Sequence, residues 1–178
     1  MNRVHAAWLA LRDSLWFVPT VITLASVLAA LLLVEAQGLL DGGLAQQWPR
    51  LFGAGADGSR ALLAAIATSM ITVAGVVFSI TVVALSLASS QFSPRVLRNY
   101  MGDRTTQVVF GVFVGIFAYC LVVLRTLRGP EDGDFIPALA VLGAIGYAFA
   151  GIGLLIYFIH HVADSIQAST IIARITRE

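Results

Sequence analysis

Four long apolar runs restrict the fold of this chain more than any other feature. They cover about residues 16–35, 61–90, 107–124 and 135–160. A helix needs roughly 20 mostly apolar residues to cross about 30 Å of bilayer hydrocarbon, and each run meets or approaches that length. The sequence therefore predicts an all-α fold, a polytopic membrane protein in which residues 1–178 form a single transmembrane domain of four helices.

Composition agrees with this prediction and excludes several classes of protein. Hydrophobic residues make up 58% of the chain and charged residues 12%, whereas water-soluble domains carry roughly a quarter charged residues. The net charge of +1 argues against nucleic acid as a partner, because duplex binding needs a concentrated basic surface. The single cysteine, Cys120, lies inside an apolar run, so we expect no disulfide framework and no thiol metal cluster.

Catalytic motifs are missing from the sequence. It contains no G-x-S-x-G, no H-E-x-x-H and no phosphate-binding glycine loop. We therefore expect no enzymatic activity and no cofactor. The apolar runs also hold no carboxylate pair and no charged residue near their centres, which disfavours a proton-coupled transporter.

The distribution of arginines predicts the orientation in the membrane. If four helices cross the bilayer, one side holds Arg3, Arg12, Arg95, Arg98, Arg104, Arg174 and Arg177, and the other holds Arg50, Arg60, Arg125 and Arg128. The side richer in arginine is usually cytoplasmic. Seven arginines against four thus predict that both termini are cytoplasmic.

A polar linker separates the second and third runs, on the predicted cytoplasmic side. Within it, Ser93 suits a helix N-cap, Pro94 the first helical position, and Gly102 a left-handed stop. We interpret the linker as a short elbow helix along the inner leaflet. Its basic residues, here called the elbow arginines, are Arg95, Arg98 and Arg104. They are predicted to bind anionic lipid phosphates at about 1 kcal/mol each; the alternative is a vestibule that concentrates anions.

The second run is the most informative element. Its residues 61–90 would extend about 45 Å as a helix, longer than the hydrocarbon is thick, so it must tilt or project into the cytoplasm. At about 100° per residue, one set of small and hydroxyl residues falls within a stripe of about 60°. This hydroxyl stripe consists of Thr68, Thr72, Gly75, Ser79, Ser86 and Ser90.

Two interpretations of the hydroxyl stripe remain open. Small and hydroxyl residues let membrane helices approach closely and form hydrogen bonds across the contact. Alternatively, several copies of this helix surround an axis, and the hydroxyls line a water-filled path without binding an ion too tightly. The stripe carries no charge, so the selectivity of such a path would come from elsewhere, such as the elbow arginines.

The remaining runs contain patterns typical of helix packing and one polar cluster. Gly111 and Gly115 form a GxxxG pair, and alanines recur at four-residue steps in the fourth run, at Ala140, Ala144 and Ala148. The polar cluster consists of His160, His161 and Asp164. A metal needs three or four ligands, so we interpret the cluster as a polar collar where the helix leaves the bilayer.

Three segments resemble a known family. They are VVFSITVVALSLASSQFSPRVLRNYMGDRTTQ, SLWFVP and YFIHHVADSIQ. They are similar to the bacterial predicted membrane proteins of domain-of-unknown-function family 2254. The resemblance implies a bacterial plasma membrane protein with four spans followed by a C-terminal soluble region that is not part of this sequence. It implies no activity and no site residues.

The residues favour one function and leave a second one open. The first is a homo-oligomeric ion channel or channel-like protein lined by the second helix. The alternative is a non-conducting scaffold or accessory subunit of a larger membrane complex. In both cases the lipid bilayer, with anionic lipids at its inner leaflet, is the expected surrounding.

Overall fold

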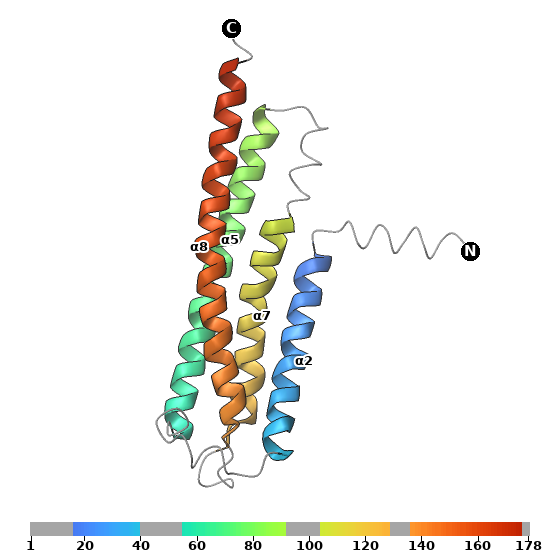
Figure 1. The fold of residues 1–178 in the computed structure, drawn as a ribbon, viewed down its shortest axis with the longest axis vertical. Helices are drawn as coiled ribbons and strands as arrows, with labels where there is room; N and C mark the ends of the chain where they lie inside the picture. Colours follow the sequence, from blue (N-terminus) through green and yellow to red (C-terminus); the bar gives the residue numbers. More distant parts are fainter. Residues whose placement is uncertain (1–15, 40–54, 92–103, 129–135, 176–178) are drawn as a thin grey trace, which may run out of the picture.

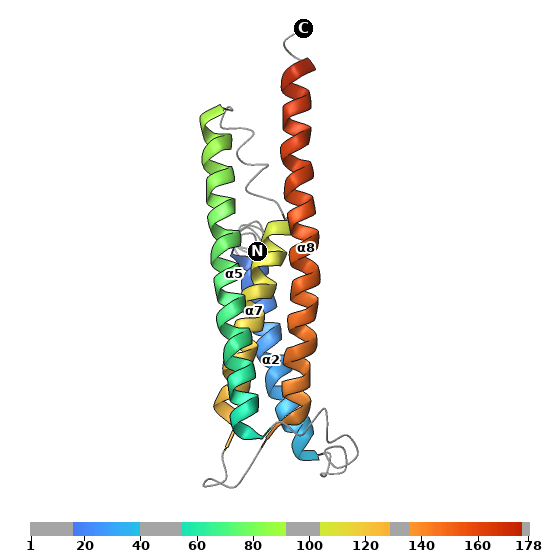
Figure 2. The same cartoon turned by 90° about the vertical axis from the view of Figure 1, so that its left-hand side faces the viewer.

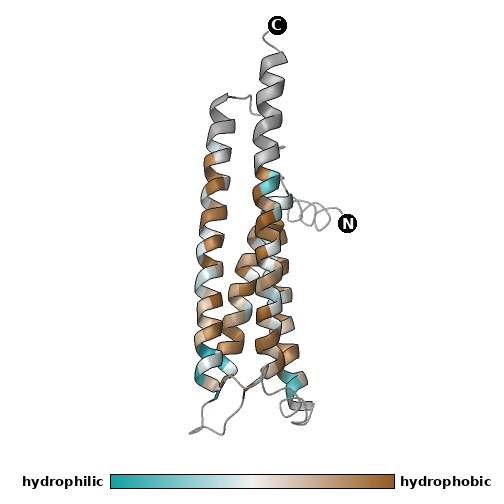
Figure 3. Ribbon diagram, turned by 60° about the vertical axis from the view of Figure 1, so that its left-hand side comes forward, coloured by the Kyte–Doolittle hydropathy of each residue, from teal (hydrophilic) through white to brown (hydrophobic). Residues whose placement is uncertain are grey.

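The computed structural model describes residues 16–39, 55–91, 104–128 and 136–175. These residues form four helices, α2 (Phe17–Leu39), α5 (Ala56–Gln91), α7 (Arg104–Thr126) and α8 (Ala138–Ile175). Each helix has a segment that is long and apolar enough to cross a membrane, as the sequence predicts. Hydrophobic residues cover most of each described span, and hydrophilic ones gather near the helix ends (Figure 3). The all-α fold class is therefore confirmed.

The helices run alternately up and down, so that two ends of the bundle can be defined. At one end α2 and α7 finish while α5 and α8 begin; we call this the Arg60 end (Figure 1). At the opposite end, here the Arg104 end, α7 begins and the long helices continue past it. In the predicted topology, the Arg104 end faces the cytoplasm.

Helix α7 lies at the centre of the bundle. It packs against each of the three other helices, most extensively against α2 and then α5, which lie on different sides of it (Figures 1 and 2). Its side chains supply much of the hydrophobic core, including Val109, Phe113, Ile116 and Val123, which are almost completely buried. The third run of the sequence thus forms the axis around which the other helices assemble.

Two glycines set the close approach of α2 and α7. A Cβ atom at Gly111 would lie 2.8 Å from the Cα of Pro19, and one at Gly115 would lie 2.5 Å from the Oγ of Ser26. Both separations are shorter than real side chains permit, so only glycine allows the backbones to come this close. The predicted packing role of this GxxxG pair is confirmed.

The predicted packing face of α8 is also confirmed. Ala140, Ala144 and Ala148 are buried in the core. Gly151 on the same side would place a Cβ 2.7 Å from the Cδ1 of Ile116 on α7. The small side chains therefore let α8 pack closely against α7.

Polar contacts join three of the helices inside the bundle. Ser26 of α2 and Tyr147 of α8 are hydrogen-bonded at 2.7 Å between their hydroxyl oxygens. Ser26 also donates to the carbonyl of Ile22 at 2.9 Å; since a serine has only one hydroxyl proton, Tyr147 is the donor to Ser26. On α7, Tyr119 donates to the carbonyl of Ala140 at 2.8 Å and meets the ring of Tyr147 edge to face.

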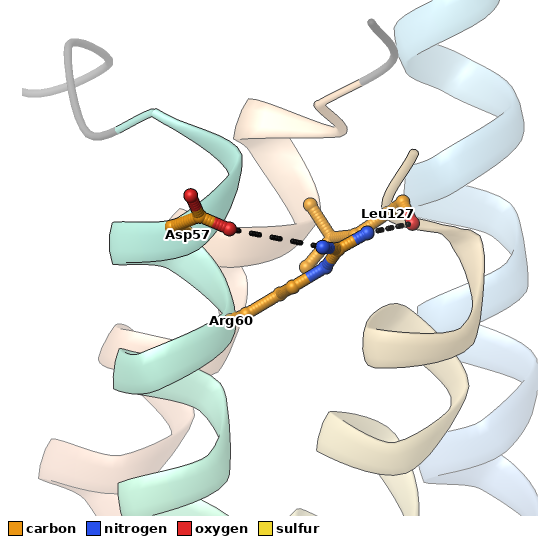
Figure 4. A network of polar contacts seen from close by, with 3 residues as sticks. All are labelled: Asp57, Arg60 and Leu127. Carbon is orange, nitrogen blue, oxygen red and sulfur yellow. Dashed lines mark hydrogen bonds and ion pairs between the residues drawn. The ribbon is translucent and has the colours of Figure 1, made fainter. Parts of the chain in front are cut away.

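Side chains from neighbouring helices also satisfy two helix ends at the Arg60 end. The amide oxygen of Gln37 accepts from the backbone N–H of Leu139 in the first turn of α8, at 3.0 Å. The guanidinium of Arg60 donates to the carbonyl of Leu127, just beyond the end of α7, at 3.2 Å (Figure 4). The first and last backbone groups of a helix have no partner within it, and a cation is favourable at a C-terminus. These contacts fasten α8 to α2 and α5 to α7.

Two of the helices are much longer than the other two. Helices α5 and α8 have 36 and 38 residues, against 23 each in α2 and α7. At 1.5 Å per residue, α5 and α8 are about 54 and 57 Å long, beyond the thickness of the hydrocarbon. Their excess length projects at the Arg104 end, as Figures 1 and 2 both show. The excess length predicted for the second run is therefore present, and the fourth helix shares it.

Candidate functional site: the outward face of helix α5

Helix α5 packs on its neighbours through one narrow apolar face. The side chains on this face recur every three or four residues and are buried: Ala56, Ser59, Leu63, Ala67, Met70, Ala74 and Val77. Thr81 continues the face and is half-buried. Phe78, beside the face, meets Phe110 of α7 with ring centroids 6.0 Å apart. This face is how α5 joins the bundle.

The hydroxyl stripe lies on the other side of the same helix. At about 100° per residue, its centre is about 150° from the centre of the packed face. The described members of the stripe are all exposed: Thr68, Thr72, Gly75, Ser79 and Ser86. The side chain of Ser90 lies outside the described residues. The stripe therefore does not mediate packing between helices of one protomer.

Gly75 illustrates how open this face is. A Cβ atom built at Gly75 would meet no heavy atom within 4 Å. In contrast, glycines 111 and 115 have neighbours that exclude any side chain. Packing within the protomer consequently does not require glycine at position 75.

One stripe hydroxyl, that of Thr72, can face either lipid or water without leaving its donor unpaired. Thr72 donates to the carbonyl of Thr68 at 2.8 Å, one helical turn earlier. An unsatisfied donor in hydrocarbon would be costly, and this bond removes that cost. The oxygen of Thr72 keeps acceptor capacity for water, an ion or a donor on another molecule.

The outward face of α2 differs in character. It exposes large aliphatic side chains, which are Leu24, Leu28, Leu31 and Leu32. Such side chains suit contact with lipid tails, whereas small and hydroxyl residues suit contact between helices. The outward side of α5 also exposes large apolar side chains beside the stripe, such as Val76, Val82 and Val83, so the stripe itself is what distinguishes it from the outward face of α2.

The elbow arginines are only partly described. Arg95 and Arg98 lie outside the described residues, as does the predicted elbow helix. Arg104 is the first residue of α7 and is exposed. It lies at the same end of the bundle as the inner part of the stripe.

The polar cluster lies where the described span of α8 ends, at Val162. His160 is exposed, and His161 stacks on Tyr157 with ring centroids 6.1 Å apart and planes 11° apart. The side chain of Asp164 lies outside the described residues. Among the residues whose placement is described, no group of three or more metal-ligating side chains occurs.

The sequence analysis missed the polar contacts that fasten the bundle. Ser26, Tyr147 and Tyr119 were not singled out, because isolated hydroxyls in apolar runs are common. Gln37 lies outside the predicted spans, and Arg60 entered the predictions only as a charge that sets the orientation. Ser26, a small polar residue in an apolar run, was a usable signal for a helix contact. A single sequence does not show, however, that its partner would be the helix that carries the GxxxG pair.

Comparison with known proteins identifies the family. A family model described as "Predicted membrane protein (DUF2254)" matches residues 12–178. Uncharacterized proteins of Mycobacterium bovis and Mycobacterium tuberculosis are 38% identical over 180 residues, a match that covers 98% of this chain and 33% of theirs. The chain thus spans about a third of the length of these relatives. No solved structure matches. The chain belongs to the DUF2254 family of predicted membrane proteins, as its FSPR-centred segment indicates.

Proposed function

We propose that this chain self-associates in the membrane and that α5 of each copy lines a path for ions, forming a channel or channel-like protein. The observation that carries the proposal is the placement of the hydroxyl stripe. Its described members are exposed and lie opposite the face through which α5 joins the bundle. An oligomer assembled with α5 towards its axis would bring several such stripes together.

The chemistry of the stripe suits a conducting wall. From Thr68 to Ser86 it extends about 27 Å along the helix, most of the hydrocarbon thickness. Hydroxyl oxygens wet a path and offer weak ligands, so that an ion can both enter and leave. The stripe has no charged group, so ion preference would be set at its ends, where Arg104 and the other elbow arginines are candidates.

A second function rests on the same face. Small residues with open space above them, such as Gly75, also suit close packing against a helix of another protein. The chain would then be a non-conducting scaffold or accessory subunit of a larger membrane complex. In both proposals the chain resides in the bacterial plasma membrane with both termini cytoplasmic, contacts anionic lipids through the elbow arginines and catalyses no reaction.

Cysteine accessibility distinguishes the two functions. Single cysteines at Thr72, Ser79 and Ser86, in a cysteine-free background, should react with a small charged thiol reagent if the stripe faces water. Matched cysteines at Val77 and Thr81, on the packed face, should stay unreactive. The reagent should also change ion flux through vesicles that contain the reconstituted full-length protein.

A steric change gives an independent test. Ser79→Leu would place a ring of leucines near the middle of the path, where narrowing and dewetting should reduce flux. Val76→Leu, exposed but beside the stripe, is the matched control and should leave flux unchanged. Lack of flux in the intact oligomer, with unreactive stripe cysteines, rules out the channel and leaves the scaffold.

A further inference from the structure

The four helices are not joined with equal strength. Helices α2 and α7 are locked by the close approach of Gly111 and Gly115 to Pro19 and Ser26. At such distances the two backbones interdigitate, so neither helix can shift without a clash. This pair forms the centre of a rigid unit.

Helix α8 is locked into the same unit. It accepts a hydrogen bond from Tyr119 at Ala140 and donates one from Tyr147 to Ser26. A Cβ atom at Gly143 would lie 2.5 Å from the hydroxyl oxygen of Tyr119, so the helix is also in close steric contact. Hydrogen bonds between membrane helices resist separation because bilayer hydrocarbon offers no replacement partner. Helices α2, α7 and α8 therefore form one rigid unit.

Helix α5 is attached to this unit differently. At the Arg60 end, Arg60 bonds the carbonyl of Leu127 and lies 3.7 Å from Asp57 (Figure 4). Beyond Leu63 its packed face is lined with apolar side chains up to Val77. An apolar face of this kind is held by dispersion contacts, which are individually small and lack the directionality of hydrogen bonds. The helix is fastened at its beginning.

Three hydroxyls of α5 bond to the backbone of the helix itself. Ser69, Thr72 and Thr81 each donate to the carbonyl four residues earlier, at 2.7–2.8 Å. Such bonds compete with the regular helix ladder and often bend helices. They lie on both sides of Gly75, whose backbone is intrinsically the least helical of any residue except proline. Bends in helices concentrate at this kind of position.

Fewer side chains of α5 are buried after the glycine than before it. Beyond Gly75, Val77 is the one fully buried side chain among those described, and Thr81 is half-buried. The other described side chains are exposed: Val76, Phe78, Ser79, Ile80, Val82, Val83 and Ser86. The part of α5 that precedes Gly75 is thus clamped at Arg60 and buries six side chains of the packed face. The described part that follows is held by Val77, by half-buried Thr81 and by the contact of Phe78 with Phe110.

From these observations we infer that α5 is a hinged helix. The segment from Ala56 to Ala74 stays fixed to the rigid unit, and the segment after Gly75 swings relative to that unit at the Arg104 end. The inference does not depend on the proposed function, because the hinge would exist in a scaffold as well as in a channel. In a channel, the swing would move the inner half of the hydroxyl stripe and so provide a gate.

Distances between pairs of spin labels test the hinge. In a cysteine-free full-length protein, diluted with unlabelled copies in nanodiscs, a pair at Ser86 and Ile159 reports α5 against α8. A pair at Val21 and Ile159 measures the distance between α2 and α8 within the rigid unit, near the Arg104 end. A pair at Glu35 and Leu62 measures the distance between α2 and the fixed end of α5. All of these positions are exposed. We expect a broad distance distribution for the first pair and narrow ones for the other two.

The matched substitutions are Gly75→Ala and Gly153→Ala. Neither added Cβ atom meets a neighbour within the protomer, so both changes should fold. Gly75→Ala should narrow the Ser86–Ile159 distribution to the width of the rigid-unit pair, because alanine favours the straight helix. Gly153→Ala should leave it unchanged. A Ser86–Ile159 distribution that is narrow from the start, or that stays broad in Gly75→Ala, overturns the hinge. The hinge is also overturned if Gly75→Ala dissociates the oligomer without narrowing the Ser86–Ile159 distance distribution. The role of Gly75 would then be to allow close contact between copies of the chain.

Discussion

Replacing Gly115 with alanine tests the packing of the rigid unit most directly. The new Cβ atom would lie 2.5 Å from the Oγ of Ser26, 3.0 Å from the hydroxyl oxygen of Tyr147 and 3.4 Å from the Cβ of Ser26. The first separation is far inside van der Waals contact. Helix α2 or the Ser26 side chain has to move, and the 2.7 Å hydrogen bond between Ser26 and Tyr147 is disturbed with it.

The expected cost of Gly115→Ala combines two effects. Forcing one extra methyl group into a packed site costs about 1–3 kcal/mol. Loss of a hydrogen bond between membrane helices adds about 0.6 kcal/mol on average and up to about 1.7. The greater helix propensity of alanine offsets up to about 1 kcal/mol of this cost, so we expect the variant to lose about 1–4 kcal/mol of unfolding free energy.

The chain contains its own reporter for this measurement. Cys120 is the single cysteine and is completely buried in the core of α7. Its alkylation, followed while the protein is titrated from a mild detergent into SDS, reports opening of the bundle. Gly153→Ala is the control: its Cβ meets nothing within 4 Å, and its greater helix propensity should leave stability unchanged or raise it by up to about 1 kcal/mol.

A second substitution checks the assigned cause. Ser26→Ala removes the oxygen that clashes most closely with the new Cβ atom. The Cβ of residue 26 then lies at 3.4 Å, and the hydroxyl oxygen of Tyr147, at 3.0 Å, can shift because it has lost its partner. In the Gly115→Ala background, Ser26→Ala should therefore recover part of the lost stability, while alone it should cost stability. If Gly115→Ala is as stable as Gly153→Ala, or if the two changes at 115 and 26 are simply additive, the steric explanation is wrong.

Three further predictions concern the ends of the bundle. A cysteine at Gly55, in a cysteine-free background, should react with an impermeant thiol reagent in intact cells while one at Asn99 should not; the opposite pattern would reverse the predicted topology. Changing the three elbow arginines to glutamine should weaken binding to anionic liposomes if these residues bind lipid phosphates. If they form a vestibule, the same change should alter ion preference, most strongly at low salt. If neither lipid binding nor ion preference changes, the elbow is a simple turn. Arg60→Ala removes the donor to the carbonyl of Leu127 and should lower the unfolding free energy by about 1 kcal/mol, measured by the same alkylation assay; an unchanged value would show that the contact does not fasten α5.

The number and type of the membrane helices can be predicted from the sequence alone. Long apolar runs predict membrane helices because crossing hydrocarbon is a local requirement, met by consecutive residues. The excess length of the second run and the existence of the hydroxyl stripe follow from helix rise and helix periodicity, which are local as well. The spacing of Gly111 and Gly115 and that of the alanines of α8 likewise predict packing faces.

Which helix packs against which becomes visible only in the assembled bundle. The tertiary structure placed α7 at the centre, set Gly111 and Gly115 against α2, and left Gly75 open although it reads as the same kind of small residue. It also showed that Arg60, which the sequence offers only as a charge for predicting orientation, donates a hydrogen bond to the carbonyl of Leu127 at the end of α7. Helix periodicity shows which residues share one face of a helix, but it does not show which other helix packs against that face. In a bilayer lipid tails are as apolar as a neighbouring helix, so hydrophobicity does not separate a buried face from an outward one. Pairing instead depends on shape and on hydrogen bonds between residues far apart in the chain, which is why the outward position of the stripe emerged only from the assembled helices.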